Sequence, residues 1–272
     1  MNPNRIVLAL ATCVAGVSVA AAEIRIEHKA FTPAPPPPAE TIAAWKAAFT
    51  AETFTAPDSA RIPYRLHRPA RPGRLPVVLV LHGSGGIGSD NQSQMGAFSA
   101  AWAAPDHAKN NPAIIIVPQA PIRTANYETG DDGLPASRAG PPLATILALM
   151  DRFSRDPGVD PSRISVVGFS MGASAAMQAV LARPQLFSAA VAFSAVPPPR
   201  AAARRMPRIP LLLVHGDKDA ENPVEPDLAW AAALNRTSSR GRMIVYGGMD
   251  HRIPDDMLTG WDWRTWVLAQ RR

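Results

Sequence analysis

The chain has 272 residues, of which 47% are hydrophobic and 18% are charged. This composition excludes a disordered polyelectrolyte, and the length suits one α/β domain with a sizeable core. The net charge of +6 raises the question of nucleic-acid binding, but no aromatic residues alternate with the scattered arginines, so we expect no nucleic-acid partner.

The first 22 residues have the pattern of a signal peptide. A short basic stretch, Met1 to Arg5, precedes an uncharged apolar stretch that ends in three alanines at Ala22. We expect cleavage after Ala22 and export to the periplasm or the medium, with no stable membrane anchor. The alternatives are an uncleaved anchor, for which the apolar stretch is marginal in length, and a lipoprotein acylated at Cys13.

Residues 23–60 are expected to form an N-terminal extension. Prolines occupy positions 35–38 within a stiff, linker-like stretch. Apolar residues at helical spacing between Thr41 and Phe54 predict a short amphipathic helix. The main domain is then expected to span residues 61–272.

Short apolar segments alternate with segments of helical periodicity throughout the main domain. Strands that are apolar on both faces, separated by helices, indicate a mostly parallel sheet covered by helices on both faces. The two longest loops are too short to fold as a separate lid domain. The expected strands are Leu75–Leu81, Ala113–Val117, Ile164–Val167, Ala189–Phe193, Leu211–Val214 and Met243–Tyr246, the expected helices are Gln94–Ala104, Leu143–Phe153, Ala173–Leu181, Leu228–Leu234 and Asp255–Gln270, and the loops are Gln119–Gly140 and Ala195–Arg208.

The sequence Gly168-Phe169-Ser170-Met171-Gly172 joins one expected strand to the helix that follows it. A sharp strand-to-helix turn of this kind exposes a serine hydroxyl at the carboxyl end of a parallel sheet, where active sites lie. Glycines flank the serine because side chains at those positions would collide with neighbouring backbone. Ser170 is therefore the candidate nucleophile.

A serine hydroxyl needs a base to accept its proton, and two histidines follow Ser170 in the chain. His251 lies in a glycine-rich loop after the last expected strand, where this architecture places the base, and it is the candidate. His215 ends the preceding strand and is expected to be buried and hydrogen-bonded.

The candidate acid lies on the loop after strand 211–214, which offers two carboxylates. Asp219 is preferred because it lies further into the loop and can turn back towards His251. Asp217 is expected to brace the same turn through hydrogen bonds to its backbone.

Acyl transfer also needs N–H donors for the oxyanion of the tetrahedral intermediate. One donor is expected from the backbone of Met171, directly after the nucleophile. The second is expected from loop 82–86, where the Ser84 N–H is preferred and the Gly85 N–H is the alternative. His82 is expected to shape this loop through hydrogen bonds.

A series of motifs follows in an order that is specific to one group of proteins. The segments concerned are residues 81–86, 88–91, 117–121, 159–164, 168–172, 215–219 and 266–272. Together they resemble the α/β-hydrolase superfamily and, within it, the secreted "predicted peptidase" and phospholipase/carboxylesterase-like serine esterases. The resemblance covers the chain from about Tyr64 to the end. An aromatic residue is expected soon after segment 117–121, and the nearest one is Tyr127 rather than a tryptophan.

The resemblance implies an α/β-hydrolase catalytic domain over residues 61–272. It also implies that a triad of Ser170, Asp219 and His251 hydrolyses carboxylic esters without a cofactor or a metal. Small-molecule or carbohydrate-linked esters are the expected substrates. A serine peptidase or amidase with the same triad, and a non-catalytic secreted binding protein on a hydrolase scaffold, are the alternatives.

One basic cluster stands out, formed by Arg200, Arg204, Arg205 and Arg208. Its loop is expected to border the entrance of the active site. The cluster either steers an anionic substrate or is a solvated face, and the sequence alone leaves both interpretations open.

Overall fold

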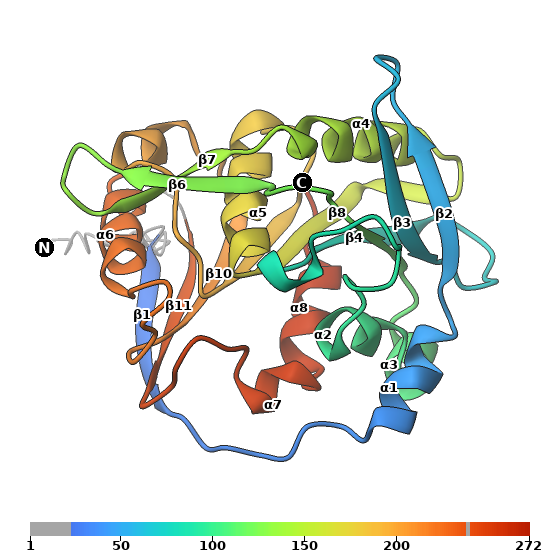
Figure 1. Ribbon diagram of the computed structural model, residues 1–272, viewed down its shortest axis with the longest axis horizontal. Helices are drawn as coiled ribbons and strands as arrows, with labels where there is room; N and C mark the ends of the chain where they lie inside the picture. Colours follow the sequence, from blue (N-terminus) through green and yellow to red (C-terminus); the bar gives the residue numbers. More distant parts are fainter. Residues whose placement is uncertain (1–22, 238–239) are drawn as a thin grey trace, which may run out of the picture.

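A computed structural model describes residues 23–237 and 240–272, so the expected signal peptide lies outside the described residues. Within them the main sheet has the strand order β1-β11-β10-β9-β8-β4-β5-β3-β2 (Figure 1). β3 is antiparallel to both of its neighbours, and the other pairs are parallel. The strands are β1 Ile24–Ala30, β2 Thr50–Thr55, β3 Arg61–His67, β4 Leu75–Leu81, β5 Ile114–Pro118, β8 Val159–Phe169, β9 Ala189–Phe193, β10 Pro210–Gly216 and β11 Arg240–Gly247.

Helices cover both faces of this sheet and enclose one apolar core on each side (Figure 1). Strand β4 contributes alternately to the two cores: Leu79 faces one of them, and Val78 and Val80 face the other. One core is closed by α4 Pro142–Ser154, α5 Met171–Ala182 and α6 Glu225–Leu234, and the other by α1 Ala39–Lys46, α2 Ala97–Ala100, α3 Pro105–Asn110, α7 Asp255–Leu258 and α8 Asp262–Ala269. The mostly parallel sheet covered on both faces is therefore confirmed.

Residues 23–60 contribute two strands to the main sheet. β1 pairs with β11, and β2 pairs with β3. The helix expected from Thr41 to Phe54 is wrong at its C-terminal end, because α1 ends at Lys46 and β2 follows. β-Branched threonines in β2 favour extended backbone. Both strands lie at exposed edges of the sheet, so they carry little of the apolar pattern that reveals buried strands.

The expected loop Gln119–Gly140 contains a hairpin formed by β6 Ala125–Thr129 and β7 Pro135–Ala139. The hairpin packs on α5, where the Gln178 side chain donates a hydrogen bond of 2.6 Å to the Ser137 carbonyl. Figure 1 shows it crossing that helix above the main sheet. Its strands are short and exposed, which explains why the apolar pattern does not reveal them.

The helix expected from Asp255 to Gln270 is interrupted, which corrects its prediction as one element. It consists of α7 and α8, and a Cβ at Gly260 between them would lie 2.3 Å from the Asp256 carbonyl oxygen. The buried Arg264 guanidinium donates hydrogen bonds to carbonyls in this break, at 2.6 Å to Gly260 and 2.8 Å to Leu258. The interruption is therefore held by a specific set of contacts.

No helix in the described ranges has both the length and the apolar character to span a membrane.

Asn235, directly after α6, bonds through its side chain to the backbone of Ile24, the first residue of β1. Its Oδ1 accepts the Ile24 N–H at 2.5 Å, and its Nδ2 donates to the Ile24 carbonyl at 3.3 Å. We expect Asn235→Ala to lower the free energy of unfolding by about 1 kcal/mol and to speed amide hydrogen exchange in β1. Asn110→Ala, at an exposed asparagine of α3, is the control. Unchanged exchange of β1 in Asn235→Ala would contradict this role.

Candidate active site

Ser170 lies at the sharp turn between β8 and α5. Its backbone has φ 55° and ψ −123°, a conformation that costs a non-glycine residue about 1–3 kcal/mol. The Ser170 N–H donates to the Phe193 carbonyl of β9 at 2.8 Å. This contact with the neighbouring strand holds the strained turn and directs the hydroxyl away from the sheet.

The two glycines of the motif are required by contacts across this turn. A Cβ at Gly168 would lie 2.2 Å from the carbonyl oxygen of Gly172. A Cβ at Gly172 would lie 2.2 Å from the carbonyl oxygen of Leu81, at the end of β4. Backbone meets backbone at both points, so neither position accepts a side chain without displacing a strand or the helix.

The structure brings together Ser170, His251 and Asp219. The Ser170 Oγ lies 2.9 Å from His251 Nε2, and His251 Nδ1 lies 2.7 Å from Asp219 Oδ2. The imidazole can thus accept the hydroxyl proton on one nitrogen while its other nitrogen donates to the carboxylate. This arrangement is the one that activates serine nucleophiles.

Asp219 is held as a carboxylate by donors on both oxygens. Oδ1 accepts the backbone N–H groups of Glu221 at 3.0 Å and Asn222 at 2.8 Å, and Oδ2 faces the two imidazole rings of His215 and His251. Burial alone would raise the Asp219 pKa, but the hydrogen bonds from His215, His251 and the Asn222 N–H outweigh it and hold the pKa well below its usual range.

Asp217 braces a different segment from the one expected. Its Oδ1 accepts the Gly248 N–H at 2.7 Å, and Gly248 belongs to the loop that carries His251. The expectation that Asp217 bonds to backbone groups of its own turn is therefore wrong. Gly248 has φ +83°, so this hydrogen bond fixes a turn that only glycine adopts readily.

A second histidine–carboxylate pair lies behind the triad. His215 Nδ1 lies 2.8 Å from Asp227 Oδ2, and His215 Nε2 lies 2.7 Å from the Asn222 carbonyl and 3.3 Å from Asp219 Oδ2. Both ring nitrogens thus face acceptors, which favours the doubly protonated imidazolium. Burial opposes this charge, but the hydrogen bonds that His215 donates to Asp219 and Asp227 prevail and raise the His215 pKa to about 10.

His215 is buried and hydrogen-bonded, as expected, but its partner Asp227 was not foreseen from the sequence. Asp227 is fully buried on α6, and burial raises the pKa of its carboxyl group. The available signal was an acidic residue directly before the expected helix Leu228–Leu234.

The candidate oxyanion donors lie at the starts of two helical turns. Met171 is the first residue of α5, so its N–H has no acceptor within the helix. Ser84 is the first residue of a 3₁₀ turn, Ser84–Gly86, and lines the same cavity as Ser170. The Gly85 alternative belongs to the same turn.

His82 shapes this loop as expected. Its Nδ1 lies 2.7 Å from the Gly83 carbonyl, and its Nε2 accepts the Ala120 N–H at 3.1 Å, so the ring joins two loops. Burial lowers the His82 pKa, which fits a neutral ring with one donor and one acceptor. A Cβ at Gly86 would lie 2.7 Å from this ring, which explains the glycine there.

A cavity of about 450 Å³ opens above the Ser170 hydroxyl. The hairpin and the loop before it supply part of its wall, and sequence reasoning missed that contribution apart from noting Tyr127. No arginine of the Arg200–Arg208 cluster lines this cavity. Arg200 lines a separate small cavity and forms an ion pair with Asp132 at 3.4 Å. The lining residues are Ser84, Arg123, Asn126, Tyr127, Ser170, Glu221 and Asn222.

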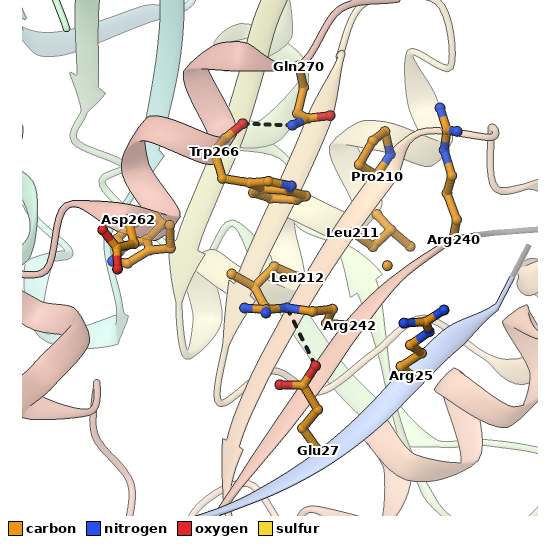
Figure 2. A pocket seen from close by; sticks show the side chains of 12 residues that line it. Arg25, Glu27, Pro210, Leu211, Leu212, Arg240, Arg242, Asp262, Trp266 and Gln270 are labelled. Atoms are coloured by element: carbon orange, nitrogen blue, oxygen red, sulfur yellow. Dashed lines mark hydrogen bonds and ion pairs between the residues drawn. The ribbon is translucent and has the colours of Figure 1, made fainter.

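A larger groove, of about 740 Å³, lies at the amino-terminal ends of β10 and β11 (Figure 2). Arg25, Arg240 and Arg242 surround it, with the Trp266 ring on the side of α8. In the part of the chain that the structure describes, no serine, cysteine or histidine lines this groove. The candidate nucleophile Ser170 lies instead at the smaller cavity, at the other end of the strands. Among the described residues, no group of histidine, cysteine and acidic side chains could hold a metal ion.

Comparisons with known proteins agree with this fold. Residues 144–261 match the sequence family described as Phospholipase/Carboxylesterase. A crystal structure of a thermostable esterase superimposes with a TM-score of 0.75 at 24% identity, over 84% of this chain and 64% of that one. A puromycin-hydrolyzing peptidase of Mycobacterium tuberculosis superimposes with a TM-score of 0.61 at 16% identity, over 86% of this chain and 41% of that one. At these identities the likeness shows the fold alone.

The chain therefore has the α/β-hydrolase fold that its motifs predict, and over residues 144–261 it is similar to the Phospholipase/Carboxylesterase family. It is also similar to NocK of Nocardia uniformis subsp. tsuyamanensis, whose name marks it as a proposed esterase. The two are 29% identical over 175 residues, which cover 60% of this chain and 46% of NocK. The chain thus spans about half the length of this curated relative.

Asp227→Asn tests the second pair. A histidine whose pKa folding raises stabilises the folded state fully below its unfolded pKa of about 6.5, and loses that contribution as the pH rises to about 10. We expect the variant to lose about 3 kcal/mol at pH 6 and to show a flatter decline of stability between these pH values. Urea unfolding at a series of pH values measures both effects. An unchanged slope would contradict a charged His215.

Proposed function

We propose that this protein is a serine carboxylic ester hydrolase that acts through an acyl-enzyme. The observation that carries the proposal is the continuous hydrogen-bonded chain from Asp219 through His251 to the Ser170 hydroxyl, at a strained turn facing a cavity. The family-level similarity to esterases supports the same reaction class.

In the first half of the reaction, the Ser170 oxygen attacks the ester carbonyl carbon while His251 Nε2 takes its proton. The carbonyl oxygen becomes an oxyanion, and the backbone N–H groups of Ser84 and Met171 stabilise it. The intermediate collapses when the C–O bond to the alcohol breaks, and the imidazolium gives its proton to the departing alkoxide oxygen. The acyl group is then bound to Ser170.

Water completes the cycle by the same route. His251 accepts a proton from water as its oxygen attacks the acyl carbon, and the same N–H donors stabilise the second oxyanion. When the bond to the Ser170 oxygen breaks, the proton returns from His251 to that oxygen and the carboxylic acid leaves. Asp219 remains ionised throughout, because its role is to orient the ring and stabilise its positive charge.

A serine peptidase is the second candidate. Its support is the similarity in fold to peptidases, which superimpose with lower TM-scores than the esterase does. An amine is a poorer leaving group than an alcohol and depends more strictly on a proton delivered at the right position.

The esterase proposal also includes export directed by the expected signal peptide. Its substrates are small-molecule or carbohydrate-linked esters.

Replacing Asp219 and Asp217 separately by asparagine tests which of them is the acid of the triad. Asp219→Asn is expected to cut kcat for p-nitrophenyl ester hydrolysis by roughly 10²–10⁴-fold, because the amide no longer stabilises the imidazolium. Asp217→Asn, the matched control, is expected to act mainly on thermal stability through its bond to Gly248. Circular dichroism checks that both variants fold. A folded but inactive Asp217→Asn beside an active Asp219→Asn would show that the triad acid is misassigned.

A substrate panel separates the two candidate activities. Purified protein is tested on p-nitrophenyl esters, hydroxycinnamoyl sugars and peptide p-nitroanilides at equal concentrations. We expect kcat/KM for the best ester to exceed that for the best amide by at least about 100-fold. A preference for amides that is lost in Ser170→Ala would establish the peptidase instead.

A further inference from the structure

Arg123 is the cationic side chain in the wall of the cavity that contains Ser170. It lies between β5 and β6, and it is half-buried. Its guanidinium lies 4.7 Å from the centre of the Tyr127 ring, and its Nε donates to the Ala125 carbonyl at 3.0 Å. These two contacts hold the side chain in one orientation before any substrate arrives.

The terminal nitrogens of Arg123 have no acidic partner. No carboxylate of the described residues forms an ion pair with this guanidinium. Other arginines of the same region are paired, Arg138 with Glu128 on the hairpin and Arg200 with Asp132. Nε is already used, so the two terminal nitrogens remain as a fork of N–H donors beside the nucleophile.

Tyr127, the platform under Arg123, is itself tied to the core of the site. Its hydroxyl accepts a hydrogen bond from the Ser174 Oγ of α5 at 3.3 Å. The Ser174 hydroxyl also accepts the Val196 N–H at 2.9 Å. The Arg123 side chain is thus connected through Tyr127 to α5, the helix that follows the nucleophile. Because the side chain is already ordered in the free protein, it loses little conformational entropy when a ligand binds.

Glu221 is the acidic side chain of the same cavity. Its Oε2 lies 3.7 Å from His251 Nε2, and its side chain is 74% exposed. It forms no ion pair with Arg123. The cavity is therefore polarised, with a negative charge beside the base and an unpaired positive charge on the hairpin side.

We infer that Arg123 binds a carboxylate carried by the ester substrate, so that the enzyme prefers anionic esters. The inference rests on the proposed esterase function. A guanidinium fork matches a carboxylate in a bidentate geometry that an ammonium group does not provide. The repulsion from Glu221 directs this carboxylate to the hairpin side and leaves the ester carbonyl at Ser170.

Two pairs of esters, in each of which one member carries a carboxylate and the other is neutral, test this inference. Mono-p-nitrophenyl adipate and p-nitrophenyl hexanoate place the charge on the acyl side. 4-Acetoxybenzoate and its methyl ester place it on the alcohol side. The measured quantity is the ratio of kcat/KM for the anionic ester to that for its neutral partner, which cancels general losses of activity.

In at least one pair, Arg123→Gln is expected to lower this ratio about tenfold, mainly through KM. Arg123→Lys keeps the charge without the fork and is expected to recover about a third of the loss. Glu221→Gln is expected to raise the ratio, because it removes the opposing charge. Arg200→Gln, the matched arginine outside the cavity, is expected to leave it unchanged.

The outcomes separate the inference from the function on which it rests. If the wild type hydrolyses the neutral esters but Arg123→Gln leaves the ratio unchanged in both pairs, carboxylate recognition by Arg123 is wrong and the esterase stands. An equal fall in Arg200→Gln would also overturn it, because general charge would then explain the effect. If the wild type hydrolyses none of the four esters, the proposed function itself fails.

Discussion

The Asp219 carboxylate is buried, and it stays charged because donors reach it from the backbone of its own loop and from two imidazole rings. Removing a carboxylate from water costs several kcal/mol unless hydrogen bonds replace its hydration. Here they do so asymmetrically: the backbone of its own loop fixes one oxygen, and His251 and His215 share the other. The direction of the His251 ring, and hence of its free nitrogen towards Ser170, follows from this arrangement.

The parallel sheet explains how such distant residues meet. Ser170, Asp219 and His251 each follow the carboxyl end of a different strand, β8, β10 and β11, and those ends lie along one edge of the sheet. The loops are locked to one another by short contacts. A Cβ at Gly216 would lie 2.1 Å from the Met249 carbonyl oxygen, and Asp217 bonds to Gly248. These contacts hold the triad loops in place, while the hairpin supplies part of the wall of the cavity.

The sequence was informative wherever one local feature determined the structure. Apolar runs such as Leu75–Leu81 marked the buried strands, and the glycines around Ser170 marked a turn that tolerates no side chain. The order of the motifs pointed to the superfamily. Each of these signals depends on residues close together in the chain.

Features that depend on distant partners were missed. The edge strand β1 and the β6–β7 hairpin are too exposed to show an apolar pattern, and pairing across the fold holds them in place. Tertiary structure likewise determines that Asp227 pairs with His215 and that Arg123 lines the cavity. The Arg200–Arg208 cluster was the visible basic feature, yet an isolated arginine lines the cavity.

Covalent labelling of Ser170 tests the central claim most directly, because it reports activation of the nucleophile without a choice of substrate. A fluorophosphonate is incubated with the folded wild type and with Ser170→Ala, and intact mass and peptide mapping locate the adduct. We predict one adduct for each wild-type chain, on Ser170, and none on the variant. An unlabelled wild type, or an adduct at another residue that persists in Ser170→Ala, would contradict the account.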